Sequence, residues 1–132
     1  AVDADAKSTL ALLNLGVALN RQEKFADAIP VLREALRLED GLTAARLHLG
    51  FALVETGQYK EAEPLLLRVV KTSGAEEILG QMYLGQLYAR TGQYEKSIAA
   101  FELYLQKAPN AANAAEVRSL IEKLHQKLGP AN

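Results

Sequence analysis

A recurring Leu-Gly pair is the feature that most constrains the fold of this chain. The pair returns at steps of 34 and 35 residues, as Leu15-Gly16, Leu49-Gly50 and Leu84-Gly85. A period in this range is typical of repeat proteins, in which each copy is one supersecondary unit that buries its apolar face against the next copy. The sequence therefore predicts three stacked copies of one unit.

An aromatic residue keeps the same step as the Leu-Gly pair, at Phe25, Tyr59 and Tyr94. In the second and third copies it ends a shared string, Thr-Gly-Gln-Tyr, at positions 56–59 and 91–94. Glycine adopts the left-handed backbone conformation that often ends a helix, so this string predicts a turn between two helices. In the first copy Glu23 stands in place of that glycine.

Apolar residues around these anchors have helical spacing. Leu12, Leu15, Gly16 and Leu19 follow i, i+3, i+4, i+7, and a similar stripe begins at Ala28. Each copy is therefore predicted to be a helical hairpin. A glycine inside a helix costs about 0.8–1 kcal/mol relative to alanine, so a close approach of two helices is expected there, with small residues facing the glycines. The expected small partners are Ala28, Ala62 and Ser97.

These anchors resemble the pattern of the tetratricopeptide repeat: Leu-Gly, an aromatic residue after the turn, Ala, a large apolar residue and a closing Pro. The third copy is the best match, with Leu84, Gly85, Tyr94, Phe101 and Pro109. The resemblance implies an all-α, right-handed superhelix of seven helices that forms a single domain over residues 1–132. Its expected parts are a lead-in at 1–8, repeats at 9–42, 43–77 and 78–111, and a capping helix at 112–128.

The capping helix is predicted from one apolar stripe that would pack on the last repeat: Val117, Leu120, Ile121, Leu124 and Leu128. We expect Asn110 to cap its start and Gly129 to end it. A capping box of Ser73 and Glu76 is expected before the third repeat.

Composition and charge exclude several classes of protein. With 15 Lys and Arg residues against 16 Asp and Glu residues, spread evenly, the chain has no basic patch for nucleic acid. No apolar run approaches the roughly 18 residues needed to cross a bilayer, so no membrane insertion is expected. The chain has no cysteine, and its location is expected to be cytoplasmic, with a periplasmic or membrane-anchored parent protein as the alternative.

Residues for catalysis are scarce. The two histidines, His48 and His125, fall in different predicted elements and have no ligand partner at helical spacing. The nine glycines are isolated from one another, so no phosphate-cradling loop is expected. The sequence therefore predicts a protein that is not an enzyme and that uses no cofactor and no metal.

The first helix of each predicted hairpin carries a second stripe, which hairpin packing does not use. The resemblance implies that this stripe lines the concave face of the superhelix, where relatives bind peptides or a helix of another protein. We expect Phe51, Tyr83, Leu47 and Met82 to anchor such a segment. The full set of expected groove residues is Leu13, Asn14, Val17, Asn20, Arg21, Leu47, His48, Phe51, Val54, Leu79, Met82, Tyr83, Gln86 and Arg90.

Three other interpretations remain open at this stage. Leu13, Leu47 and Met82 could serve only to pack successive first helices together. The chain could also be a structural module that self-associates into a homo-oligomer or forms part of a longer solenoid in a larger protein. RNA binding is the weakest interpretation, because the groove offers only Arg21 and Arg90 as cations.

Overall fold

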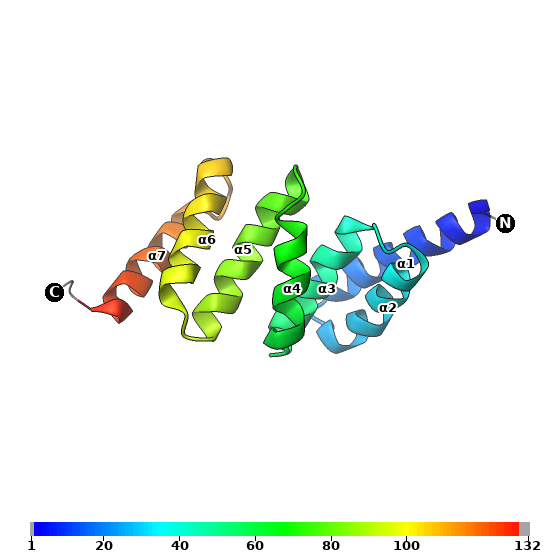
Figure 1. The fold of residues 1–132 in the computed structure, drawn as a ribbon, viewed down its shortest axis with the longest axis horizontal. Coiled ribbons are helices and arrows are strands. Elements are labelled where there is room, and N and C mark those ends of the chain that lie inside the picture. Colours follow the sequence, from blue (N-terminus) through cyan, green and yellow to red (C-terminus); the bar gives the residue numbers. More distant parts are fainter. Residues whose placement is uncertain (1, 130–132) are drawn as a thin grey trace. The chain divides into compact units, whose positions relative to one another are not determined.

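The computed structural model describes the backbone of residues 2–129 and the side chains of residues 7–129. Over this range the chain forms seven helices and no strand, as predicted (Figure 1). The chain divides into two compact units, Ala1–Val69 and Val70–Asn132, which we call unit one and unit two. The division falls inside the predicted second repeat, at the end of its second helix.

Unit one contains two helical hairpins. Helices α1 (Val2–Arg21) and α2 (Phe25–Leu38) form the first, and α3 (Thr43–Glu55) and α4 (Tyr59–Val69) form the second. Helix α3 also packs against α2 and, less extensively, against α1. The predicted lead-in at 1–8 belongs to α1, which is helical from Val2.

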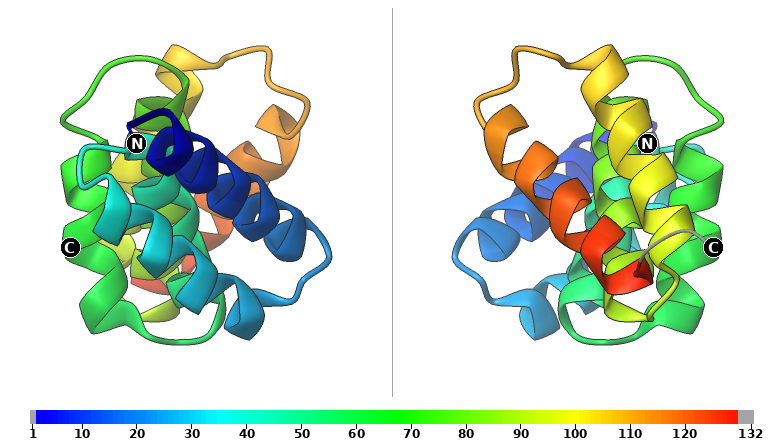
Figure 2. Two further views of the ribbon diagram at one scale, coloured as in Figure 1. Left: turned by 90° about the vertical axis from the view of Figure 1, so that its right-hand side faces the viewer. Right: turned by 90° about the vertical axis from the view of Figure 1, so that its left-hand side faces the viewer.

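Unit two contains one hairpin and the final helix. Helices α5 (Ala75–Arg90) and α6 (Tyr94–Lys107) form the hairpin, and α7 (Ala114–Leu128) packs beside α6 (Figure 2). Val117 and Leu124 of α7 are buried with Phe101 and Tyr104 of α6, so α7 covers the hairpin as the sequence predicted. Leu120 and Leu128 of the same predicted stripe are exposed instead.

The hairpin helices approach closely at the repeated glycines. A β-carbon added to Gly16 would lie 2.4 Å from Leu32 Cδ2, and one added to Gly50 would lie 2.7 Å from Leu66 Cδ2. At Gly85 the nearest atom is Cε1 of Phe101, at 2.5 Å. The expected close approach is confirmed, but large side chains fill the space above the glycines. Of the small partners that the sequence predicted, Ser97 does contact its glycine, because its Oγ donates to the main-chain oxygen of Gly85 at 2.7 Å. The same expectation for Ala28 and Ala62 stays a prediction.

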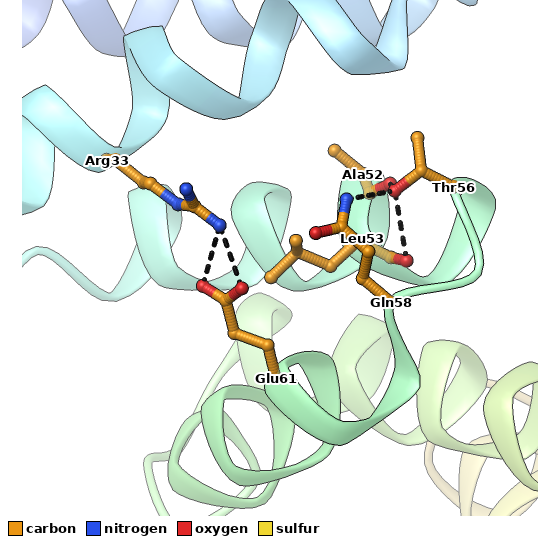
Figure 3. A network of polar contacts seen from close by, with 6 residues as sticks. All are labelled: Arg33, Ala52, Leu53, Thr56, Gln58 and Glu61. Carbon is orange, nitrogen blue, oxygen red and sulfur yellow. Dashed lines mark hydrogen bonds and ion pairs between the residues drawn. The ribbon is translucent and has the colours of Figure 1, made fainter.

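The turn inside the second hairpin is held by side chains as well as by its glycine. Gly57 has a φ of 77°, in the left-handed region. Thr56 Oγ1 donates to the main-chain oxygen of Ala52 at 2.9 Å, and Gln58 Nε2 donates to Thr56 Oγ1 at 2.9 Å (Figure 3). The string at 91–94 repeats this arrangement, with the same two kinds of hydrogen bond. In the first hairpin Glu23 adopts the left-handed conformation at φ 60° without glycine's freedom.

The predicted helix starts differ from the observed ones. Helix α5 begins after Gly74, which has no side-chain cap, so the expected capping box of Ser73 and Glu76 was wrong. The residue that precedes α7 is Asn113 rather than Asn110, and its side chain accepts a hydrogen bond from Tyr104 Oη at 2.6 Å instead of capping the helix. Gly129, with a φ of 78°, ends α7 as expected.

Candidate functional site

A hollow of about 540 Å³ lies between α1 and α3 in unit one. We call it the α1–α3 hollow. Helix α3 lines it with Ala44 and His48, and α1 with the turn after it supplies the rest. The α1 residues are Leu13, Asn14, Val17, Ala18 and Arg21, and Gln22 follows in the turn after α1. The structure thus brings together five predicted groove residues: Leu13, Asn14, Val17, Arg21 and His48.

The helical periodicity of α1 explains why these residues line a hollow. Gly16 faces α2, where its missing side chain leaves room for Leu32. Val17 is about 100° further around the helix, and Leu13 and Arg21 are one turn to either side of Val17. This stripe therefore points away from the α1–α2 contact and borders the space beside α3.

The lining of the α1–α3 hollow combines apolar and polar groups. Leu13 and Val17 are half-buried, so part of each side chain is accessible from the hollow. Asn14 and Arg21 are exposed, and neither side chain forms a hydrogen bond or ion pair with another residue in the range 7–129. No carboxylate is among the lining residues. The hollow can therefore accept an apolar group and at the same time offer hydrogen-bond donors to a backbone or an acidic group.

Asn20 lies at the crossing of α1 and α3 and is buried. Its Nδ2 donates to the main-chain oxygen of His48 at 3.0 Å, which joins the two helices beside the hollow. Its Oδ1 is buried without a hydrogen bond from the residues that the structure describes. Asn20 therefore positions α3 against α1, although the sequence placed it among the ligand-contacting residues.

Three further predicted groove residues lie on α3. Leu47 and Val54 are fully buried and offer no accessible surface to a ligand. The ring of Phe51 packs edge-on against Phe25, with 5.5 Å between the ring centroids. The burial of Leu47 fits the alternative interpretation, in which the stripe only packs successive first helices together. Phe51 contacts Phe25, the first residue of α2.

A second, smaller hollow of about 280 Å³ lies in unit two, among α5, α6 and α7. We call it the α5–α7 hollow. Two predicted groove residues, Gln86 and Arg90, line it. The other lining residues were not predicted to belong to a groove: Ala89, Phe101, Leu120 and Leu124. The only sequence signal for Leu120 was its place in the stripe of the capping helix, which favoured packing over binding.

The remaining predicted residues of α5 lie outside the lining of the α5–α7 hollow. Met82 packs against the buried cluster of α6 and α7, and its sulfur accepts a hydrogen bond from Asn113 Nδ2 at 3.2 Å. Tyr83 is buried and Leu79 is half-buried. The structure therefore gives Met82 a packing role, and the anchor role that the sequence predicted for Tyr83 stays a prediction.

Two features of other kinds of protein are absent from the described residues. Among them, no group of three or more His, Asp or Glu side chains is placed to hold a metal ion. No helix in the same range is long and apolar enough to cross a membrane.

Comparison with known proteins gives the chain a family. The tetratricopeptide repeat family matches it twice, over residues 19–79 and over residues 79–111. The chain is also similar to the cell division cycle protein 27 homolog A of Arabidopsis thaliana, with 21% identity over 118 residues. That match covers 89% of this chain but only 16% of the plant protein.

A solved structure has the same fold. The double mutant called MamA RS-1 ArsTM superposes on the chain with a TM-score of 0.65 and 23% sequence identity. The superposition covers 92% of this chain and 78% of that one. With the Leu-Gly period, the helical hairpins and the two family matches, these findings establish that the chain belongs to the tetratricopeptide repeat family.

Proposed function

We propose that the chain binds an apolar or amphipathic segment of a partner protein, with the α1–α3 hollow as the contact surface in unit one. Membership of the tetratricopeptide repeat family makes the chain a protein–protein interaction scaffold. The finer proposal rests on one observation: Leu13 and Val17 remain accessible beside the exposed side chains of Asn14 and Arg21. No step of this function is catalytic.

The chemistry of the lining determines which segments fit. Removing apolar area from water contributes about 25 cal/mol per Å², so an aliphatic or aromatic side chain over Leu13 and Val17 supplies the affinity. Asn14 and Arg21 then donate hydrogen bonds to main-chain oxygens of the segment, which fixes its register. In unit two, Arg90 and Leu120 of the α5–α7 hollow provide the same combination of groups.

A peptide-display selection on the intact chain tests this proposal. Peptides that bind are measured again on Val17→Glu and Arg21→Glu variants, whose folding is checked by circular dichroism. We expect each substitution to weaken binding by about tenfold, because central contacts carry most of the binding energy. Leu67→Glu is the matched control, since Leu67 is an exposed leucine of α4 that does not line the hollow.

Two results would count against the hollow as the binding surface. One is a set of selected peptides that bind both groove variants as tightly as the unchanged chain. The other is a loss of binding in the Leu67→Glu control that equals the loss in the groove variants.

A second candidate function is supported by the outer face of α1. Leu15 is 49% exposed there, next to the exposed Ala11, so an apolar strip is open to a second copy of the chain. Self-association through this strip predicts a sedimentation coefficient that rises with concentration and a loss of that rise in Leu15→Glu. A monomer at every concentration would rule out this candidate and would leave the groove proposal unaffected.

A further inference from the structure

Two arginines and one aspartate form a cluster in unit one that is separate from the α1–α3 hollow. Arg46 extends from the first turn of α3, Arg68 from the last turn of α4, and Asp40 from the loop between α2 and α3. One carboxylate oxygen of Asp40 lies 3.8 Å from Arg46 Nη2, and the other lies 3.8 Å from Arg68 Nη2. The cluster therefore holds two positive charges against one negative charge.

Arg46 is buried but only partly satisfied. Its side chain is 6% exposed, and its guanidinium carries five N–H donors. Among the residues that the structure describes, it donates one hydrogen bond, from Nη2 to the main-chain oxygen of Asp40. Its remaining donors form no hydrogen bond with another described residue.

Asp40 forms no hydrogen bond with either arginine through its carboxylate. Its carboxylate oxygens are too far from both arginines for hydrogen bonds, which need about 2.7–3.2 Å, and its side chain is 84% exposed. A pair this open to water contributes little, with typical values of about 0–1 kcal/mol. Asp40 can therefore swing into solvent and leave both guanidiniums to another anion.

The surroundings also favour an anion. Burial, and then the charge of Arg68, lower the pKa of Arg46, while Asp40 acts in the opposite direction. The residue before α3, Leu42, supplies no side-chain cap, so the positive end of that helix dipole is not neutralised by a capping side chain. This helix start carries the largely buried Arg46 in its first turn.

We propose that Arg46 and Arg68 form a phosphate-binding site in which the incoming group displaces Asp40. A phosphate group carries a charge of about −1.5 to −2 near pH 7 and three strong acceptor oxygens, which match the N–H donors of two guanidiniums. The site would take inorganic phosphate or a phosphate group on a partner. It requires no ligand in the α1–α3 hollow.

Titration of the full chain with inorganic phosphate tests this site. Two-dimensional NMR follows the amide signals and the arginine side-chain signals at constant ionic strength, with chloride as the balancing anion. We expect saturable shifts at Asp40, Arg46 and Arg68. Removing a charge at contact distance should change the affinity by about fivefold, so Arg68→Gln weakens binding by that factor and Asp40→Asn strengthens it. Arg37→Gln is the matched control, because Arg37 is an exposed arginine that pairs with Glu34.

The outcomes separate clearly. Saturable shifts at the cluster that weaken in Arg68→Gln and persist in Arg37→Gln support the site. Linear shifts without saturation, equal shifts with chloride, or an unchanged affinity in Arg68→Gln would overturn it. Acetate is titrated in parallel, and tighter binding of acetate than of phosphate would overturn the assignment to phosphate. Because the titration uses no peptide, its failure does not bear on the proposed peptide binding.

Discussion

Helices α1 and α3 have the same residue at several equivalent positions, and yet these residues differ in burial. Leu15 of α1 is 49% exposed, whereas Leu49, its equivalent in α3, is 3% exposed. Ala11 is exposed and Ala45 is buried. Further identical pairs, half-buried in α1 and buried in α3, are Ala18 with Ala52 and Leu19 with Leu53.

The difference between these helices has a simple cause. Helix α2 packs against α3, while no helix among the described residues covers the corresponding face of α1. Position within the repeat therefore selects the residue type, but the neighbouring helix determines whether that residue stabilises the fold. The equivalent leucines therefore differ in role: Leu49 belongs to the core, whereas Leu15 lies on an exposed surface.

The largest expected effect is at the leucines themselves. Leu49→Ala should lower the free energy of unfolding by about 2–5 kcal/mol, because a buried leucine leaves a cavity when it is truncated. Leu15→Ala should cost less than about 1 kcal/mol, since much of that side chain already faces water. Urea denaturation of both variants measures the two values. Equal losses of unfolding free energy in the two variants would show that the face of α1 that carries Leu15 is covered. The contrast between α1 and α3 would then be wrong.

The next largest loss of stability is expected in both repeats, when the helix glycine is replaced by alanine. Gly16→Ala and Gly50→Ala each place a β-carbon less than 3.0 Å from a leucine of the facing helix. We expect each to lower the free energy of unfolding by about 1–3 kcal/mol through overpacking, partly offset by the better helix propensity of alanine. Thermal denaturation checks this expectation. Higher stability in either variant would mean that Leu32 or Leu66 moves aside without cost.

A smaller change in stability is expected at the turns of the two hairpins in unit one, which contain Glu23 and Gly57. Glu23 bears the cost of a left-handed conformation, which is about 1–2 kcal/mol for a residue with a β-carbon, while Gly57 avoids it. Glu23→Gly should therefore raise the free energy of unfolding by about 0.5 kcal/mol, because glycine also increases the entropy of the unfolded chain and so offsets part of the gain. Gly57→Ala should lower the free energy of unfolding by about 1 kcal/mol. Chemical denaturation curves of the two variants should shift in opposite directions. A shift in the same direction would contradict the assignment of strain to Glu23.

The smallest effect is expected at the ion pair between the two hairpins of unit one. Arg33 Nη2 lies 2.8 Å from Glu61 Oε1 and 2.9 Å from Glu61 Oε2 (Figure 3). Both side chains are about half exposed, so a double-mutant cycle with Arg33→Ala and Glu61→Ala should give a coupling of about 0.2–1 kcal/mol that falls at high salt. A coupling that is insensitive to salt would indicate a role beyond this exposed pair.

Sequence patterns predicted the helical hairpins well because those patterns arise from short-range geometry. Spacing at 3.6 residues per turn and the left-handed turn at Gly57 depend on neighbours along the chain. The groove lining was harder to predict, because it depends on which side chains the next helix covers. Val17 and Leu47 occupy the same predicted stripe, but the first lines the α1–α3 hollow and the second is buried. No local signal separates them.

Arg46 illustrates the same limit for charged residues. No sequence pattern singled it out, but the structure buries it beside the loop that carries Asp40. Three segments of unit one meet there, and only the folded chain brings them together. Such clusters are invisible to a search for motifs at fixed spacing.

The most direct test of the central claim is to locate a bound segment on the first helices. A peptide obtained by display selection is titrated into the isotope-labelled chain, and amide shifts are mapped by NMR. Our account predicts that in unit one the largest shifts occur at Leu13, Val17 and His48, with little change at Leu38 and Leu67, which are exposed elsewhere. Shifts concentrated at Leu38 or Leu67, with the α1–α3 hollow unaffected, would contradict the account.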